Sequence, residues 1–392
     1  MKKTIYNAKL VKSDKVIENG YVTYDNGVII SVGEGVPVTD GEMLDAEGKF
    51  VSAGFVDIHC HGGGDADFND GEVESFIIPA QMHATHGTTT LVPTITTGPA
   101  EDVLVAFKSF NTAKNSEYDG ARIVGIHMEG PYISLAQAGA QDPRYIRAPK
   151  REDYENLIKN SDNSIIRWTV APELEGAEEF SRYLKDRGIL VSIGHSNAIY
   201  EDVEKAYNSG AELLTHFYSG MSTITRVDGY RKLGVIESGY VIDGMNVEVI
   251  ADGHHLPREL LLMIYKFKGS DRIALVTDSM RGAGMPEGDT VLGNRETGLH
   301  CIIEGGVAKL PDRTAFAGSV CTADRLVRTM YKTVGVTISE AIKMMTETPA
   351  RLIGLEKEVG TLEAGKRADI VIFDDDICID TTIVGGKTVY KA

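Results

Sequence analysis

The stretch Phe55-Val56-Asp57-Ile58-His59-Cys60-His61-Gly62-Gly63 leads from an apolar run into a His-x-His pair and a glycine cluster. If the run from Phe55 to His59 is a strand, the side chains of His59 and His61 point to the same side, because side chains alternate with a period of two. Two imidazoles on one face at a strand end are well placed to bind a metal ion. An isolated His-x-His is more often a pair of surface or core histidines, so its meaning depends on the other strand ends.

Short apolar runs rich in β-branched residues alternate with amphipathic stretches of helical length from Gly54 to about Gly354. Helices are expected at 72–86, 176–187, 198–209 and 257–268, and several end at a glycine, as helix C-termini prefer. Strands are expected at 55–59, 88–94, 122–128, 165–170, 189–193, 212–216, 246–251 and 273–277. Eight strands with mostly helical connections predict an α/β fold, a (β/α)8 TIM-like barrel rather than an open sheet.

The two ends of the chain differ in character from the barrel segment. Residues 1–52 and 355–392 read as short strands and turns, which predicts one small β-sandwich domain built from both termini beside a barrel of residues 53–354. Asn-Gly pairs at 19–20 and 26–27 favour tight hairpins. Residues 281–316 predict an inserted hairpin or flap. Two helices are expected after it, at 322–334 and 338–353, the second introduced by the capping-box pattern Thr337-x-x-Glu340.

Composition restricts the class of protein. The hydrophobic content of 42% and the charged content of 25% over 392 residues are those of a globular protein with a large core. A net charge of -17 argues against nucleic acid and membrane partners, but it leaves room for an anionic small substrate. Four scattered cysteines indicate neither a disulfide framework nor a structural zinc site. No signal-peptide pattern and no long apolar run occur, so we expect a cytoplasmic protein.

Polar residues of metal-binding type stand at the ends of most of the expected barrel strands. In a (β/α)8 enzyme the chemistry lies at the C-terminal ends of the strands. Each residue alone could be a structural polar group, but four histidines and two carboxylates on one rim imply a shared role. Imidazole and carboxylate together suit zinc or iron-type divalent ions. The set is His59 and His61 after the first strand, Glu129 after the third, His195 after the fifth, His216 after the sixth and Asp278 after the eighth.

The motifs around these residues resemble those of a known family. They are similar to motifs of the amidohydrolase superfamily, and within it to those of the N-acetylglucosamine-6-phosphate deacetylases. The resemblance covers nearly the whole chain, because that family also has a split β domain and a closing Gly-x-Leu-x-x-Gly-x-x-Ala-Asp run, here residues 360–369. The motifs are the His-x-His, His127-Met128-Glu129-Gly130-Pro131, Gly194-His195-Ser196, Thr215-His216, Asp252-Gly253-His254-His255 and Thr277-Asp278-Ser279-Met280.

The resemblance implies a divalent metal centre. Glu129, His195 and His216 would bind one ion, and His59 and His61 a second, with Glu129 between the two. Many superfamily members bridge two metals with a modified lysine, but no lysine stands at a suitable strand end here. Some relatives lack the second histidine of the His-x-His and use one metal. The number therefore stays open at one or two ions per subunit, zinc or iron.

The resemblance also implies the catalytic groups. Asp278 would hold the attacking water, act as general base and pass the proton to the departing amine. His255 would contact the substrate and polarise the acetyl carbonyl, which stabilises the charge of the tetrahedral intermediate. His254 is expected to face away. For His127, a supporting role beside the metal and a place in the core are both open.

The substrate pocket is where this chain departs from the family pattern. Relatives have Asn-Ala after the Thr-His segment and a nearby basic run for the phosphate, whereas this chain has Phe217-Tyr218-Ser219-Gly220 and then the basic segment 225–232. Backbone N–H groups there could still bind an anion. Arg231 could replace the missing cation or belong to a solvated loop. The candidate substrate-binding residues are Gln141, Ser219, Gly220, Arg231 and His255.

The resemblance implies a deacetylase that hydrolyses the acetamide of N-acetylglucosamine 6-phosphate to glucosamine 6-phosphate and acetate. Deacetylation of the N-acetylgalactosamine 6-phosphate epimer is an alternative. The altered loop 217–232 also keeps open another amide or N-acyl substrate, although Glu129 and the Asp252-Gly253-x-His255 motif count against it. A non-catalytic scaffold is disfavoured, because such proteins usually lose metal ligands. Family precedent suggests a homodimer in which the partner subunit helps to close each pocket.

Overall fold

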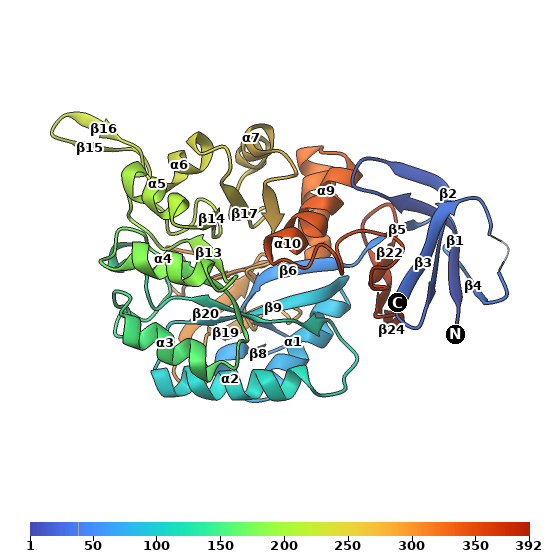
Figure 1. Cartoon of the computed structure of the whole chain (residues 1–392), viewed down its shortest axis with the longest axis horizontal. Coiled ribbons are helices and arrows are strands. Elements are labelled where there is room, and N and C mark those ends of the chain that lie inside the picture. The colour runs from blue at the N-terminus through green and yellow to red at the C-terminus, as the bar shows by residue number, and fades with distance from the viewer. Residues whose placement is uncertain (38) are drawn as a thin grey trace.

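A barrel and a smaller β domain lie side by side along the long axis of the molecule (Figure 1). The structure is a computed structural model that describes residues 1–37 and 39–392. Within those residues, no helix is long and apolar enough to cross a membrane.

The barrel consists of eight parallel strands in the order β6-β9-β11-β12-β13-β14-β17-β18, which confirms the predicted (β/α)8 fold. Its strands are largely buried, which explains why the sequence shows apolar runs rather than alternation. The backbone N–H of Asp278 donates to His59 O (2.9 Å), so the chain after the last strand meets the first and the barrel is nearly closed. The bounds are β6 Phe55–Cys60, β9 Thr88–Thr96, β11 Ile126–Glu129, β12 Ile165–Val170, β13 Leu190–Ile193, β14 Ala211–Leu214, β17 Asn246–Val249 and β18 Ile273–Leu275; a short strand, β10 Arg122–Ile123, adds to β9.

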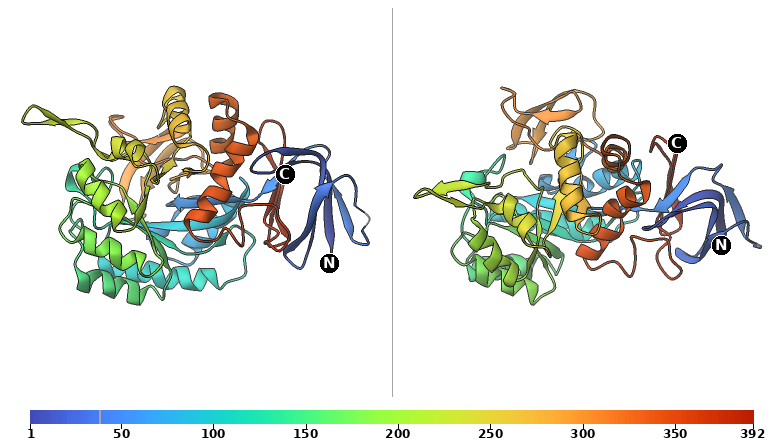
Figure 2. Two further views of the ribbon diagram at one scale, coloured as in Figure 1. Left: turned by 45° about the horizontal axis from the view of Figure 1, so that its top comes forward. Right: turned by 90° about the horizontal axis from the view of Figure 1, so that it is seen from above.

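Helices cover the outside of the barrel (Figure 2). They are α1 Glu74–Ala84, α2 Ala100–Lys114, α3 Arg151–Asn160, α4 Ala177–Lys185, α5 Tyr200–Asn208, α6 Val235–Val241, α7 Arg258–Lys268, α8 Ala323–Arg328, α9 Ile338–Met345 and α10 Glu347–Leu352. The side chain of Thr337 accepts the N–H of Glu340, as the capping pattern predicts. The single helix predicted at 338–353 is wrong, because it breaks at Thr346. Pro349 lies three residues further on, and a proline ring clashes with the carbonyl four residues before it.

The small domain joins both ends of the chain in one eight-stranded sheet, as predicted. The turn at Asn26-Gly27 has φ of 48° and 78°, which suits a tight hairpin. The hairpin predicted at Asn19-Gly20 is wrong. Gly20 lies within β2, where a Cβ would approach the Leu10 side chain to 2.5 Å, so close packing rather than a turn requires glycine. The strands are β1 Lys3–Val11, β2 Val16–Asp25, β3 Val28–Glu34, β4 Glu42–Asp45, β5 Phe50–Ala53, β22 Ile370–Phe373, β23 Ile379–Val384 and β24 Lys387–Lys391.

Two insertions extend from the barrel. The predicted flap is a three-stranded antiparallel sheet of β19 Gly288–Leu292, β20 Leu299–Glu304 and β21 Val307–Lys309. A two-stranded hairpin, β15 Thr225–Val227 and β16 Tyr230–Lys232, projects from the body near α5 and α6 (Figures 1 and 2). The flap covers one side of the cavity described below, whereas the hairpin does not contribute to its wall.

Candidate metal centre and active site

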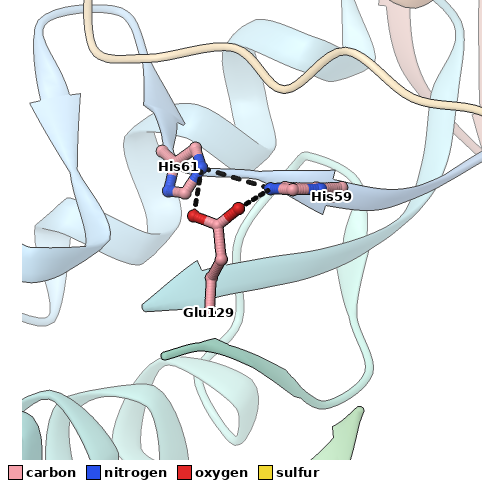
Figure 3. Close-up of side chains that lie close together, drawn as sticks. All are labelled: His59, His61 and Glu129. Atoms are coloured by element: carbon pink, nitrogen blue, oxygen red, sulfur yellow. Dashed lines mark hydrogen bonds and ion pairs between the residues drawn. The ribbon is translucent and has the colours of Figure 1, made fainter. Parts of the chain in front are cut away.

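Two buried groups of side chains meet at the C-terminal ends of the barrel strands and share Glu129. One group is His59, His61 and Glu129; the other is Glu129, His195 and His216, and in each group the ligand atoms lie within 4.8 Å of one another. Figure 3 shows the first group, in which the Nε2 atoms of both histidines face the carboxylate of Glu129, at 3.4 and 3.5 Å. The structure thus brings together Glu129 and the four histidines that the resemblance implied as metal ligands.

The distances within this cluster fit a divalent ion. The Nε2 atoms of His59 and His61 are 3.2 Å apart, and those of His195 and His216 are 3.1 Å apart. Two ring nitrogens at such a distance need a proton or a cation between them, because their lone pairs repel. Ligand bonds of ~2.0–2.1 Å to a tetrahedral zinc ion place neighbouring ligand atoms about 3.3 Å apart. The donor set and its spacing therefore suit zinc or a similar ion.

The backbone is strained at three of the strand ends. His195, His216 and Asp278 have φ of 47°, 31° and 46°, in the left-handed region that non-glycine residues rarely adopt. Such a conformation costs on the order of 1–3 kcal/mol and persists only where the surrounding structure fixes it. The sharp turn lets the backbone turn away at the end of each strand, while the side chain stays directed towards the ligand cluster.

The electrostatics of the cluster favour protons on the imidazoles when no metal is bound. Burial opposes the charged form of His216, but Glu129 outweighs it and raises the pKa of His216 to about 9. Burial likewise opposes the charge of His61, but Asp278 and Glu129 raise its pKa to about 9. Burial would raise the pKa of Asp278, but His59 and His61 hold it at about 2. A metal ion would take the place of these protons.

Asp278 lies beside the first ligand group. Its Oδ1 atom is 3.3 Å from His59 Nε2 and 3.1 Å from His61 Nε2. His255, which follows the neighbouring strand β17, also lines the cavity, and its Nδ1 lies 2.8 Å from the carboxylate of Asp252. Asp252 also accepts the backbone N–H groups of residues 254 and 255, so the ring has a fixed orientation. With Nδ1 donating to Asp252, the Nε2 edge of His255 is left for a ligand.

A cavity of ≈ 850 Å³ is lined by His61, Glu129, His195, His216, His255 and Asp278. Its remaining wall comes from segments 96–103 and 139–145, from flap residues Leu292 to Leu299, and from Phe316. Among the described residues, Arg144 is the only lysine or arginine in this wall, and its Nε donates to Asp142 at 3.0 Å. The cavity is large enough for a small polar molecule.

The predicted substrate-binding residues have different positions. Gln141, Ser219 and Gly220 line the cavity, as does His255. However, Gln141 donates to the carboxylate of Glu129 (2.8 Å) and accepts the N–H of Thr97 (2.9 Å), so its amide orients the bridging glutamate. The N–H of Ser219 already donates to His216 O at 2.9 Å, which leaves its hydroxyl and the Gly220 N–H for a ligand.

Arg231 lies on the exposed hairpin β15–β16 and is not part of the cavity wall of its own chain. Its cross-strand neighbour is Arg226, and Lys232 pairs with Glu201. The expected contact between Arg231 and a substrate phosphate stays a prediction.

Two charged residues inside the barrel were not anticipated from the sequence. Arg167 in β12 and Glu248 in β17 form a fully buried ion pair beneath the ligand cluster. A carboxylate oxygen of Glu248 also lies 3.1 Å from Nδ1 of His59. The available signal was a charged side chain in the middle of an otherwise apolar expected strand. His127, also beneath the cluster, lies between the hydroxyls of Thr94 and Thr169, and burial holds its pKa well below the ordinary value.

A (β/α)8 barrel with a carboxylate-bridged histidine cluster and a further aspartate at its C-terminal rim defines a hydrolase of the metal-dependent class. The chain belongs to the amidohydrolase family, which matches residues 50–389. It is therefore an enzyme that hydrolyses amide bonds.

Known proteins resemble the chain over nearly its whole length. An N-acetylglucosamine-6-phosphate deacetylase of Vibrio furnissii is 34% identical over 339 residues, covering 86% of this chain and 82% of the relative. An N-acetylgalactosamine-6-phosphate deacetylase of Escherichia coli O157:H7 is 30% identical and covers 97% of each chain. The crystal structure of N-acetylglucosamine-6-phosphate deacetylase from Pasteurella multocida matches with a TM-score of 0.91 at 28% identity, covering 100% of each chain.

Proposed function

We propose that this chain is a metal-dependent deacetylase that hydrolyses N-acetylglucosamine 6-phosphate to glucosamine 6-phosphate and acetate. The observation that carries the proposal is the convergence of the Glu129 cluster, Asp278 and the His255–Asp252 pair on one cavity. The deacetylases among the relatives support the substrate class. A phosphorylated sugar as substrate would place the enzyme in the cytoplasm.

In this proposal Glu129, His195 and His216 would hold one divalent ion, zinc or iron. His59 and His61 would hold a second, together with Glu129, which belongs to both groups. A divalent ion at this position supplies a nucleophile at neutral pH by lowering the pKa of water towards ~7, and it polarises a carbonyl. The complete His-x-His favours two ions over one.

The catalytic steps are assigned to two side chains that line the cavity, Asp278 and His255. Asp278 takes a proton from the attacking water and then delivers it to the departing amine nitrogen; at neutral pH its carboxylate is ionised and able to accept. His255, oriented by Asp252, donates from Nε2 to the acetyl oxygen when the ring carries both protons, which stabilises the negative charge that develops there. The flap residues Leu292 and Leu299 line the same cavity.

The phosphate contact is proposed to involve a second subunit. Arg144, the only lysine or arginine of the described cavity wall, pairs with Asp142, so the chain's own cavity offers no free lysine or arginine for a phosphate. The exposed hairpin carrying Arg231 projects away from the body. In a homodimer, it could reach the partner's cavity and bind the phosphate with two charge-assisted hydrogen bonds.

The test is acetate release by metal-reconstituted protein from matched substrates. N-acetylglucosamine 6-phosphate should be hydrolysed with higher kcat/KM than the unphosphorylated sugar. The galacto epimer is the second candidate, because one relative is a deacetylase of that epimer, so both phosphates must be compared. No acetate from either sugar phosphate would refute the proposal and move the search to other N-acyl substrates.

Two variants test the proposed contact between Arg231 and the substrate phosphate. Arg231→Ala should raise KM for the phosphorylated sugar and leave kcat nearly unchanged, because uniform binding energy is lost. Arg226→Ala, across the same hairpin, is the matched control and should have a smaller effect. An unchanged KM in Arg231→Ala would remove this residue from the phosphate site.

A further inference from the structure

A charged pair lies inside the barrel directly beneath the ligand cluster. Arg167 of β12 and Glu248 of β17 are fully buried and hydrogen-bonded to each other. The guanidinium also donates to Ile58 O at 3.0 Å, to Ser192 Oγ at 3.1 Å and to Thr215 Oγ1 at 3.0 Å. A buried ion pair is costly unless its remaining donors and acceptors are satisfied. Because the guanidinium donors have acceptors, this buried ion pair is a stable part of the barrel interior.

The second carboxylate oxygen of Glu248 connects the pair to both ligand groups. Oε2 lies 3.1 Å from Nδ1 of His59 and 3.1 Å from the backbone N–H of His216. His59 belongs to one ligand group and His216 to the other. One carboxylate oxygen therefore fixes a side chain of the first group and the backbone of the second.

Among the four ligand histidines, His59 alone has a carboxylate behind it in the described structure. The Nδ1 of His195 contacts a backbone carbonyl, Gln137 O, at 2.8 Å. The Nδ1 atoms of His61 and His216 have no hydrogen-bond partner among the described residues. A carboxylate behind an imidazole fixes its tautomer and makes the ring a stronger ligand, more so than a carbonyl or no partner at all.

The surroundings of Glu248 suit an ionised carboxylate that accepts a hydrogen bond from His59. The guanidinium of Arg167 pairs with one carboxylate oxygen of Glu248 and compensates its buried negative charge. An ionised carboxylate accepts and does not donate. His59 Nδ1 must therefore carry the proton, which leaves the lone pair of Nε2 directed at Glu129 and Asp278.

We propose that Glu248, held by Arg167, is a positioning residue that sets the metal affinity of the His59–His61–Glu129 subsite and so decides whether the centre retains one ion or two. The inference rests on the proposed metal centre. Loss of such an outer partner typically costs 10–100-fold in metal affinity. The Glu129–His195–His216 subsite should change less, because Glu248 contacts it only through the backbone N–H of His216.

The experiment compares three variants by metal content and by chelator competition with zinc. Glu248→Gln removes the charge at constant size. Arg167→Met/Glu248→Leu removes the whole pair and leaves no unpaired buried charge. Ser192→Ala is the matched control, since it removes one hydrogen bond to Arg167 and leaves the contact of Glu248 with His59. We expect the weaker zinc affinity to fall 10–100-fold in the first two variants, and both affinities to remain in the control.

Several outcomes would overturn the inference. Two zinc ions held with unchanged affinity in the folded double variant, or equal losses at both subsites, would show that Glu248 does not act on the His59 subsite. Wild-type protein that binds a single ion would also overturn it, whereas wild-type protein that binds none would refute the metal centre itself.

One measurement uses the wild-type protein, so it remains possible even if the Glu248 variants do not fold. In zinc-loaded wild-type protein, histidine-selective NMR should place the Nδ1–H proton of His59 far downfield, as a hydrogen bond to an ionised carboxylate requires. A signal typical of an imidazole without such a partner would overturn the inference even if both Glu248 variants fail to fold.

Discussion

Replacing Asp278 by asparagine isolates the proton-transfer step. The substitution keeps the size and shape of a side chain whose Oδ1 lies 3.1–3.3 Å from the Nε2 atoms of His61 and His59. An amide oxygen can occupy that place, but the amide cannot accept a proton at neutral pH. Loss of a general base typically costs 10²–10⁴-fold, or ~2.7–5.5 kcal/mol at about 1.36 kcal/mol per tenfold. We expect kcat to fall by that factor.

The assay must separate lost base catalysis from lost metal. Acetate release should be measured under saturating N-acetylglucosamine 6-phosphate, with zinc per chain determined on the same samples. Asp289→Asn, the same chemical change on an exposed flap residue whose side chain is 80% accessible, is the control and should keep full activity. An Asp278→Asn enzyme with its metal and with kcat within a few-fold of the parent would refute the assignment and return attention to Glu129 or His255.

Three further outcomes are expected. Chelation should abolish turnover and leave the circular dichroism spectrum unchanged, because the apolar barrel core does not depend on the ion; metal-free protein with full activity would refute the mechanism. In metal-free protein, the folded-state pKa values of His61 and His216 are about 9, above the ordinary 6.5. Their contribution to the free energy of unfolding is therefore complete below pH 6.5 and is lost as pH rises through 9, which urea titrations should show. Zinc affinity should rise over the same pH range, because the protons leave the imidazoles. Arg281→Met should destabilise by about 3–5 kcal/mol and speed proteolysis of the flap, because the buried Arg281 guanidinium pairs with Asp70 and donates to Gly293 O; an unchanged cleavage rate would show that the flap is held elsewhere.

The barrel was predictable because its strands carry the information locally. Parallel strands buried on both faces are largely apolar, so their positions stand out in the sequence as short runs rich in β-branched residues. Ligands at strand ends are equally visible, since His59, Glu129 and His216 each end or follow such a run. The residues that follow the strands of a barrel meet at one rim. Once the strands are located in the sequence, a cluster of these residues can therefore be predicted.

Other features depend on contacts between distant segments, which the sequence does not display. Gln141 reads as a substrate ligand, but in the fold its amide reaches Glu129, twelve residues away along the chain. Arg231 reads as a phosphate ligand next to the sixth strand, but residues 225–232 form their own hairpin, which carries it away from the cavity. A local pattern gives the chemistry of a side chain, while its direction depends on how the loop packs.

The ion pair within the barrel shows why the centre needs more than its ligands. His216, two residues after the end of β14, has φ of 31°, a conformation that is unfavourable for a residue other than glycine. Two hydrogen bonds from β17 hold it there: its N–H donates to the carboxylate of Glu248, and the N–H of Phe217 donates to the backbone carbonyl of Glu248 at 2.9 Å. The strained turn of one strand is thus fixed by its neighbour, and the same glutamate orients His59 across the barrel. Glu248 thus supports His216 and His59, while Arg167 holds Glu248 in place, so this buried pair shapes the site as well as the barrel interior.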